Sequence, residues 1–393
     1  MQPFSLYLHI PFCKHRCGYC DFNTYAGMDD LIPAYANALQ AEIRAFADAS
    51  GQRIPLHTIY FGGGTPSLMP AGKITAILES IDQRFEVLPD CEITLEANPG
   101  TVDINYFRDL HKGGVNRISM GVQSANPEEL RLLERQHGYA DAIHAVKYAR
   151  QAGFDNLSVD LIFGLPYQKL STWQHSLELA LALNPEHISL YALTIEHGTP
   201  LGHWVSRGLL PVPNPDTAAD MYEWTMENLD VHGYWHYEVS NWARVGQGGS
   251  FASRHNLQYW RNLDYIGMGA GAHGYVDELR IANVLAPAAY IRRCSKGTAK
   301  KFPRSPATVN VKKIDTRTEM GDTMMMGLRL LQEGVSTQSF ERRFGQSLEQ
   351  VYGEEITDLK KLDLLEWAGE SDDILRLTPK GRLLGNQVFM RFI

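Results

Sequence analysis

Short β-rich runs alternate with amphipathic helical patterns through the first half of the chain. In order, the runs are FSLYLHI, LHTIYF, CEITLEA, VNRISMGVQ, NLSVDLIFGL and HISLYAL. Apolar residues at helical spacing fill most of the intervals, as between Leu31 and Phe46. Six such units predict parallel strands, because neighbouring strands that run the same way need a crossover, usually a helix. The pattern predicts an α/β fold, either a doubly wound sheet or a barrel.

Residues with chemical character follow the ends of these runs. Three cysteines come after the first run and a GGGTP segment comes after the second. Positions in or just after the next four runs are Glu96, Gln123, Asp160 and Ala192. In a βα barrel the active site lies at the carboxyl ends of the strands. This placement therefore favours the barrel.

The last part of the chain has a different pattern. Residues 300–316 are polar, basic and interrupted by proline, which is typical of a connector. Helical patterns follow at residues 319–331, 337–344 and 348–365, and then a short strand and a capped helix. This order predicts a small helical, winged-helix-like domain over residues 301–393. No basic helix carries base-reading side chains, so we expect this domain to cover the barrel or dock a partner and not to bind nucleic acid.

Composition and charge narrow the class of protein. The chain has 393 residues, 44% of them hydrophobic, and a formal net charge of -8. This balance argues against a general binder of nucleic acid or of anionic membranes. No stretch approaches the ~20 apolar residues that span a bilayer, and the first residues do not form a signal peptide. We expect a cytoplasmic protein without a membrane anchor, in a reducing compartment where free thiols persist.

Cys13, Cys17 and Cys20 form a C-x3-C-x2-C segment directly after the first run. Three thiolates on one short loop can hold three corners of a [4Fe-4S] cluster, which leaves one iron without a protein ligand. The alternative is a zinc site completed by His9 or His15, although structural zinc usually takes its ligands from two knuckles far apart in the chain. The other two cysteines, at positions 91 and 294, are expected to be packed or incidental thiols.

This cysteine spacing resembles the signature of the radical S-adenosylmethionine (SAM) superfamily. Members of that superfamily chelate the open iron with the amino and carboxylate groups of SAM. The segment Gly62 to Pro66 resembles the glycine motif that binds the methionine amino group of SAM in the same superfamily. Glycines allow such close approach because they carry no Cβ and tolerate positive φ.

Longer segments resemble the oxygen-independent coproporphyrinogen III oxidase family. LYLHIPFC, FGGGTPS, LEANPG, RISMGVQS, LLERQH and VDLIFGLPYQ follow that family's motifs in order, and the resemblance covers most of residues 4–290. It implies a partial (β/α)6 barrel. It implies that Tyr7 lies beside the cluster and SAM. The glycine motif would bind the methionyl end of SAM, Glu96 would bind its ribose, and the other residues of the set would complete the pocket. The implied SAM-binding set is Tyr7, Gly63, Gly64, Thr65, Glu96, Gln123, Arg135, Asp160 and Ala192.

Two departures separate the chain from the oxidases themselves. Those enzymes carry a further Cys two residues after the third cluster ligand, where this chain has Phe22. The chain also begins a few residues before the first run, without the N-terminal extension of the oxidases. Both features resemble the heme-chaperone branch of the family, which implies a protein that binds heme and hands it to acceptors, including membrane respiratory enzymes. The resemblance favours a carrier over an enzyme, although the radical-SAM fold is retained.

The oxidase reaction stays as the alternative function. It would convert coproporphyrinogen III to protoporphyrinogen IX by radical-SAM oxidative decarboxylation, and the complete SAM-binding set favours it. A radical-SAM enzyme that acts on another tetrapyrrole is a third reading. Neither the acceptors nor a homodimer can be read from the residues.

Residues 233–275 are rich in His, Trp, Tyr and Gly, which predicts ordered loops with aromatic faces instead of regular helices or strands. His255 to Trp260 resembles the HNxxYW motif of the chaperone branch, where it is linked to heme. An imidazole suits heme iron, so His255 is the candidate heme ligand, with His236 and His273 as weaker ones. The alternative is that this region packs against the barrel. The expected division is a barrel over 1–200, an extension that closes it over 201–300, and a C-terminal domain over 301–393.

Overall fold

The computed structural model describes residues 2–297, 301–371 and 373–393. Contacts divide the chain into two compact units, each made of two segments. Unit 1 comprises Met1–Met221 and Asp264–Lys312, and unit 2 comprises Tyr222–Leu263 and Lys313–Ile393. The first boundary falls inside helix α8 (Pro215–Val231). The three-part division expected from the sequence stays a prediction about how the chain folds.

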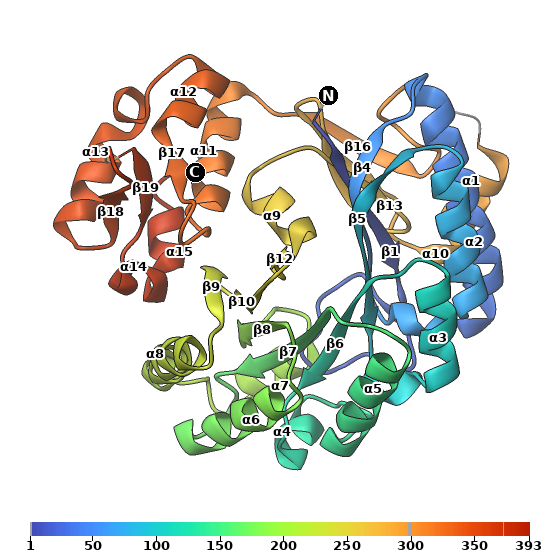
Figure 1. The fold of residues 1–393 in the computed structure, drawn as a ribbon, viewed down its shortest axis with the longest axis horizontal. Coiled ribbons are helices and arrows are strands. Elements are labelled where there is room, and N and C mark those ends of the chain that lie inside the picture. The colour runs from blue at the N-terminus through green and yellow to red at the C-terminus, as the bar shows by residue number, and fades with distance from the viewer. Residues whose placement is uncertain (1, 298–300, 372) are drawn as a thin grey trace. The chain divides into compact units, whose positions relative to one another are not determined.

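Six parallel strands form the centre of unit 1 (Figure 1). They are adjacent in chain order: β1 (Phe4–Ile10), β4 (Pro55–Gly63), β5 (Glu86–Ala97), β6 (Arg117–Gln123), β7 (Leu157–Phe163) and β8 (His187–Ala192). This sequential order is the partial (β/α)6 barrel expected above. Because all six strands point the same way, their carboxyl ends lie at one edge, where the candidate residues were expected.

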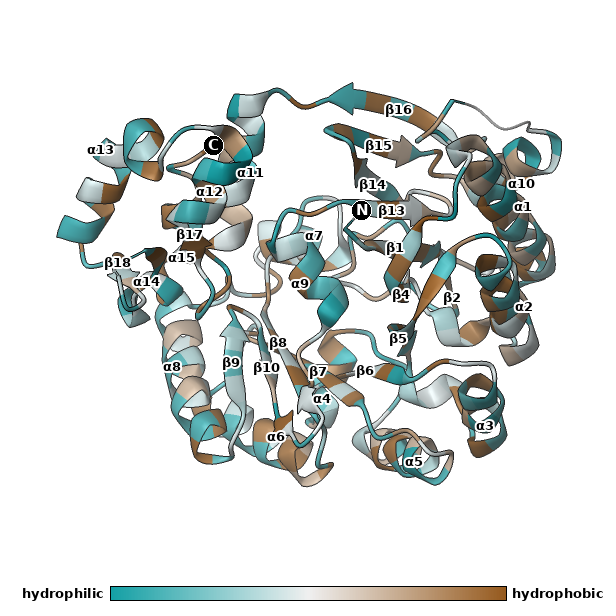
Figure 2. Ribbon diagram, turned by 45° about the horizontal axis from the view of Figure 1, so that its top comes forward, coloured by the Kyte–Doolittle hydropathy of each residue, from teal (hydrophilic) through white to brown (hydrophobic). Residues whose placement is uncertain are grey.

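Helices connect these strands and cover the outer face of the sheet (Figure 1). They are α1 (Ile32–Ser50), α2 (Ala71–Asp82), α3 (Ile104–Lys112), α4 (Pro127–Leu132), α5 (Tyr139–Gln151) and α6 (Leu170–Ala182), with α7 (Pro200–Ser206) after β8. In α1 the buried residues Tyr35, Leu39, Ile43 and Phe46 recur every three or four positions, so one face packs on the sheet. The mixture of hydrophobic and hydrophilic residues along each helix is visible in Figure 2.

A later segment extends the sheet beyond β1. Strand β13 (Tyr265–Met268) pairs in parallel with β1, and β14 (His273–Val276) and β15 (Leu279–Asn283) add antiparallel neighbours. Helix α10 (Pro287–Lys296) and strand β16 (Thr308–Lys313) follow. The region expected to be a connector therefore contributes an edge strand. Proline and basic residues are typical of a connector, but alternating apolar and polar residues also suit a strand once β15 lies beside it.

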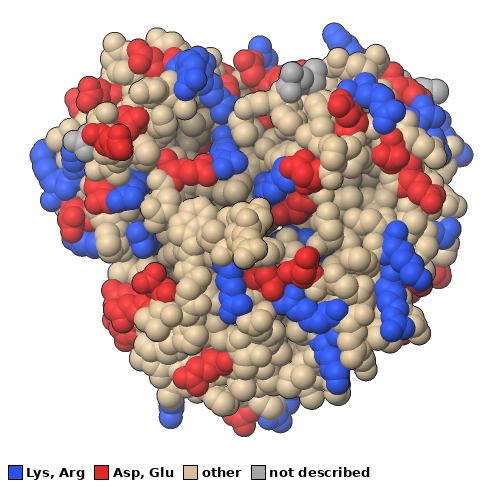
Figure 3. Space-filling view, in the orientation of Figure 1, with Lys and Arg blue, Asp and Glu red and all other residues tan. Residues whose placement is uncertain are grey.

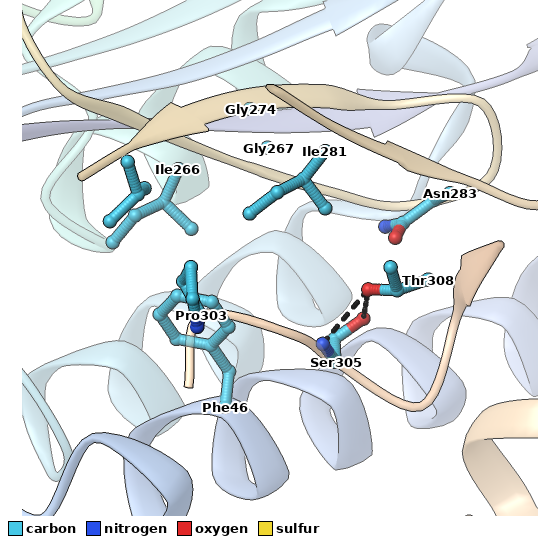
Figure 4. A pocket seen from close by; sticks show the side chains of 10 residues that line it. Phe46, Ile266, Gly267, Gly274, Ile281, Asn283, Pro303, Ser305 and Thr308 are labelled. Carbon is cyan, nitrogen blue, oxygen red and sulfur yellow. Dashed lines mark hydrogen bonds between the residues drawn. The ribbon is translucent and has the colours of Figure 1, made fainter. Parts of the chain in front are cut away.

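A buried carboxyl ties this later segment to α1. Glu42 accepts hydrogen bonds from the Gly269 backbone N–H (2.8 Å), the Asn283 amide (2.8 Å) and the Tyr290 and Ser305 hydroxyls (2.5 Å each). Burial raises the pKa of Glu42. A small cavity lies next to this network, between Phe46 of α1 and strands β13 to β15 (Figure 4). Its walls are mostly apolar, so it belongs to the packing of α1 on the sheet.

Unit 2 contains a compact α/β region at the end of the chain. Helices α11 (Thr316–Gly327), α12 (Thr337–Phe344) and α13 (Leu348–Lys361) pack with a three-stranded sheet in the order β17 (Val335–Ser336), β19 (Ile374–Leu377), β18 (Leu365–Ala368). Helices α14 (Pro379–Leu383) and α15 (Gly385–Phe389) close the chain. The order helix, strand, helix, helix, strand, strand, with the three strands in one antiparallel sheet, confirms the winged-helix-like domain.

The aromatic-rich region 233–275 is regular, which corrects the expectation of ordered loops. It forms the hairpin β9 (Trp235–Glu238) with β10 (Asn241–Ala243), the short pair β11 (Val245–Gly246) and β12 (Gly249–Ser250), and helix α9 (Arg254–Trp260), before β13 and most of β14. The Ser253 side chain caps α9 by accepting from the Asn256 N–H. Glycine and aromatic content suggested loops, but aromatic residues also favour strands once a partner strand is present.

Charged side chains of both signs interleave over the face of the molecule in Figure 3. This distribution agrees with a chain that has 37 basic and 45 acidic residues. In the part of the chain that the structure describes, no helix combines the length and apolar character needed to cross a bilayer.

Candidate functional site

The three cysteines lie on one loop at the carboxyl end of β1. Cys13 ends the short strand β2 (Phe12–Cys13), which pairs with β3 (Tyr25–Ala26) and so closes the loop at its base. Within the loop the Cys20 N–H donates to the Cys17 carbonyl at 3.1 Å. Cys13 is 7% exposed, and the other two thiols are half-buried. The loop thus presents three thiols from a single turn region.

Hydrogen-bond donors surround these sulfurs. The Thr65 hydroxyl donates to Cys13 Sγ and the Arg135 guanidinium donates to Cys17 Sγ, each at 3.6 Å. Burial raises the pKa of the Cys13 thiol, and the neighbouring thiols of Cys17 and Cys20 raise it further. Thiolates are the ligands of iron–sulfur clusters, and hydrogen bonds to their sulfurs tune such clusters. A cation and a hydroxyl directed at two of the three sulfurs fit a cluster held by thiolates.

The glycine motif lies directly against the cysteine loop. A Cβ at Gly64 would stand 2.7 Å from the Phe12 carbonyl oxygen and 3.0 Å from Cys13 Sγ. Gly63 has φ of +118°, and a Cβ there would meet the His9 ring at 2.5 Å. Any side chain at either position would collide with the neighbouring loop. The two glycines therefore let the glycine motif pack directly against the cysteine loop.

His9 joins the two ends of the cysteine loop. Its Nε2–H donates to the Asn23 carbonyl at 2.9 Å, so Nδ1 is the acceptor for the Tyr7 hydroxyl at 3.0 Å. Burial lowers the pKa of His9, which keeps the ring neutral. Both ring nitrogens are thus engaged. His15, the other histidine considered for zinc, lies 3.5 Å from the Glu134 carboxylate. In the described residues no three His, Cys, Asp or Glu side chains form a group that could hold one metal ion.

Glu96 lies beside the glycine motif. Its carboxyl accepts from the Tyr60 hydroxyl at 2.9 Å and from the Gly63 N–H at 3.1 Å. Burial raises the pKa of Glu96 to about 7; the Tyr60 hydrogen bond opposes this and the nearby Asp160 adds to it. Tyr60 also stacks on Tyr7, with ring centroids 6.2 Å apart. The sequence reasoning missed Tyr60, although the alternation of β4 places it opposite Tyr7 in the register.

Asp160 lies among hydroxyl groups inside the barrel. It accepts from Ser119 Oγ at 3.0 and 3.2 Å and from Ser158 Oγ at 3.1 Å. Burial raises its pKa, and these hydrogen bonds oppose the shift. Arg117, only 2% exposed, contributes a positive charge to the same interior and was also missed. Its position was readable from the period of two along β6, which also points Ser119 inward.

Arg135, Gln123 and Ala192 lie at the same edge of the sheet. Besides Cys17, the Arg135 guanidinium donates to the Gly121 carbonyl at 2.8 Å, and its buried Nε has no hydrogen-bond partner among the described residues. Gln123 ends β6 with φ of +68°, at a register shift opposite β7. Ala192 is the exposed last residue of β8. A buried donor without a partner suits an anionic group such as the carboxylate of SAM. The structure thus brings Thr65, Gly64 and Arg135 against the cysteines. The binding of SAM by the whole expected set stays a prediction.

The three histidines considered as heme ligands lie on three different elements of the chain. His255 lies on α9 of unit 2, is 1% exposed, and its Nε2 is 2.9 Å from the Tyr259 hydroxyl. His236, also in unit 2, stacks on Trp242 with ring centroids 3.9 Å apart, and burial lowers its pKa to about 3. His273 is exposed at the start of β14 in unit 1. The role of these three histidines in heme binding stays a prediction.

Comparison with known proteins places this architecture in a family. The Radical SAM superfamily model matches residues 7–180, and the HemN C-terminal domain model matches residues 314–384. The chain is 36% identical over 390 residues to the heme chaperone HemW of Bacillus subtilis (strain 168), covering 99% of each chain. This chain belongs to the HemW heme chaperone family. The corresponding Lactococcus lactis protein is 37% identical, over 100% of this chain and 98% of that relative.

A solved structure supports the fold of this HemW family member independently. Coproporphyrinogen III oxidase (HemN) from Escherichia coli, described as a radical SAM enzyme, superimposes with a TM-score of 0.82 over 99% of this chain and 90% of that one. The two are 23% identical, so this likeness concerns the fold. It confirms the α/β fold class and the helical C-terminal region predicted from the sequence. The family predicted from the motifs is confirmed by the HemW relatives.

Proposed function

We propose that this chain binds a [4Fe-4S] cluster, SAM and heme, and delivers heme to acceptor proteins in a reducing cytoplasm. The observation that carries the proposal is the loop of three thiols with Thr65 and Arg135 directed at its sulfurs, in a chain whose full-length relatives are named heme chaperones. Cys13, Cys17 and Cys20 are the cluster ligands. Since they supply three thiolates, the fourth iron is left for SAM.

Different residues beside the cysteine loop bind different parts of SAM. The glycine motif, packed against the cysteine loop, lies beside the methionyl end of SAM, and the unpartnered Nε of Arg135 is a donor for the SAM carboxylate. Glu96 accepts from the ribose hydroxyls. Its carboxyl is held in position by the hydrogen bonds from Tyr60 and Gly63, and a carboxylate can accept further bonds. A reduced cluster with bound SAM supplies one-electron chemistry. The chain's own groups position SAM, and Asp160 and Ala192 complete the pocket.

Phe22 is the position that separates the chaperone from the oxidase reading. Its side chain is 64% exposed and stands two residues after Cys20. A phenyl ring offers no ligand or thiol at the place where the oxidases have a cysteine. This residue favours heme delivery over the decarboxylation of coproporphyrinogen III, which is the alternative that the complete SAM set supports.

The test uses one anaerobically reconstituted sample, divided in two. One half receives coproporphyrinogen III, SAM and a reductant, and product is followed by chromatography. The other half is titrated with heme and mixed with an apo-acceptor, and transfer is followed by the acceptor's absorbance. We expect saturable heme binding and transfer without protoporphyrinogen IX.

Formation of protoporphyrinogen IX would overturn the chaperone reading in favour of the oxidase. Two variants sharpen the result at the position that separates the branches. Phe22→Cys restores the thiol of the oxidases, and Phe22→Leu is the matched control that keeps an apolar side chain. Oxidase activity in Phe22→Cys alone would show that this one residue divides the two functions.

A further inference from the structure

A hollow lies just beyond the carboxyl end of β8. It has a volume of about 580 Å³ and is formed within unit 1 by residues 195–206, which include helix α7 (Figure 1). This volume is within the range of small-molecule and cofactor sites. The hollow begins three residues after Ala192, the last expected contact of the SAM pocket.

Two imidazoles and an apolar surface line the hollow. His197 and His203 are exposed, and neither side chain has a hydrogen bond or ion pair with another described residue. Ile195, Trp204 and Val205 are half-buried beside them. A half-buried indole and two exposed imidazoles around one hollow are groups that can hold a metalloporphyrin, since imidazole ligates the iron and aromatic rings pack on the macrocycle.

The frame of the hollow is held in place on two sides. The Thr199 hydroxyl donates to the Glu196 carbonyl at 2.8 Å and accepts from the Gly202 N–H at 3.0 Å, which caps α7 between the two histidines. The Leu201 N–H donates to the Gly18 carbonyl at 2.8 Å. Gly18 lies between Cys17 and Cys20, so the segment that forms the hollow is bonded directly to the cysteine loop.

Two histidines of the aromatic-rich region are less accessible to a ligand than His197 and His203. His255 is buried and within hydrogen-bond distance of Tyr259, and His236 is stacked on Trp242. Either ring would have to leave its packed position to reach iron. His197 and His203 would not, because both are already exposed.

We infer that heme docks in the hollow of residues 195–206, with the imidazoles of His197 and His203 as iron ligands and Trp204 against the porphyrin. The inference rests on the proposed function, since it names the place where the proposed cargo is held. Docking forms iron–nitrogen coordination bonds without a change of oxidation state. An exposed site also suits a carrier, because the acceptor can take the ligand without unfolding the donor.

The test is a titration of the full-length, cluster-reconstituted protein with ferric heme, followed by the Soret band. The variants are His197→Ala, His203→Ala, the double variant and His255→Ala. His175→Ala is the matched control, because His175 is an exposed histidine of unit 1 that does not line the hollow. Cluster absorbance and the far-UV circular dichroism spectrum report folding in every sample.

We expect the double variant to lose the Soret shift of imidazole-ligated heme and to bind heme at least about tenfold more weakly, as lost coordination predicts. His175→Ala and His255→Ala keep the wild-type spectrum. Wild-type affinity and spectrum in the double variant would overturn the inference and leave the proposed function standing. Absence of saturable heme binding in the wild-type protein would overturn the proposed function itself, and the inference with it.

Discussion

The cysteine loop of unit 1 and helix α9 of unit 2 carry the motifs by which this family is recognised, but their side chains are presented in opposite ways. The thiols of Cys13, Cys17 and Cys20 share one loop, and the sulfurs of Cys13 and Cys17 accept hydrogen bonds that are compatible with metal ligation. His255 of α9 is buried, and its Nε2 pairs with Tyr259. A motif therefore identifies relatives, whereas the packing around each atom decides whether it is free to bind a ligand.

The largest effect should come from the cysteine loop. We expect Cys17→Ala to abolish stable cluster binding, so that bound iron falls from about four per chain to near zero, because two thiolates cannot hold the cluster. Iron and sulfide analysis with the absorbance near 400 nm measures this. Cys91→Ala is the control, since Cys91 is a buried thiol of β5 outside the loop. Full cluster content in Cys17→Ala would show that the loop does not hold the cluster.

Substitution of His255 should affect stability and leave the cluster intact. We expect His255→Ala to lower the free energy of unfolding by about 3 kcal/mol, because it removes a buried ring and its hydrogen bond. Denaturant unfolding of the apo-protein measures this, and iron analysis of the reconstituted variant should match wild type. Tyr259→Phe removes only the hydroxyl and should cost about 1 kcal/mol. Unchanged stability in both variants would contradict the structural role of this pair.

The Glu96 carboxyl predicts a pH dependence of stability in unit 1. Its pKa is raised to about 7 in the folded protein, so the unfolded chain loses this proton first as pH rises. Stability should therefore fall between about pH 4.5 and pH 7, by about 2 kcal/mol after allowance for solvent at the half-buried residue. Unfolding of wild type and Glu96→Gln across this range isolates the effect, because other carboxyls titrate in both. Parallel pH curves would show that the pKa of Glu96 is not raised.

The smallest effect should come from the hydroxyl beside Cys13. Thr65→Val removes the hydrogen bond to Sγ, and we expect the reduction potential of the cluster to become more negative, because that bond stabilises the more negatively charged reduced state. A redox titration followed by electron paramagnetic resonance measures the shift. Thr65→Ser keeps the hydroxyl and should restore the wild-type potential. A potential that follows side-chain volume instead of the hydroxyl would contradict this assignment.

Local patterns predicted regular elements of both units closely. The first run was expected over residues 4–10 and forms β1 with these bounds, and the helix expected over 337–344 is α12. The errors occur where pairing depends on distant residues. The region 233–275 was expected to be loops but forms β9, β10 and α9, and β16 lies in the expected connector. Strand formation there depends on neighbours supplied by the fold, which local composition does not reveal.

The amino-acid order alone was sufficient for the barrel and the family, because strand periodicity and motif spacing are local properties of the chain. Packing was needed to show that Tyr60 joins Glu96 to Tyr7, that Arg117 is buried in the barrel, and that Leu201 bonds to the cysteine loop. These contacts join residues that are distant in sequence. The same packing distinguishes a buried, engaged His255 from the exposed His197 and His203, since the exposure of a side chain is a property of the folded chain and not of its sequence neighbours.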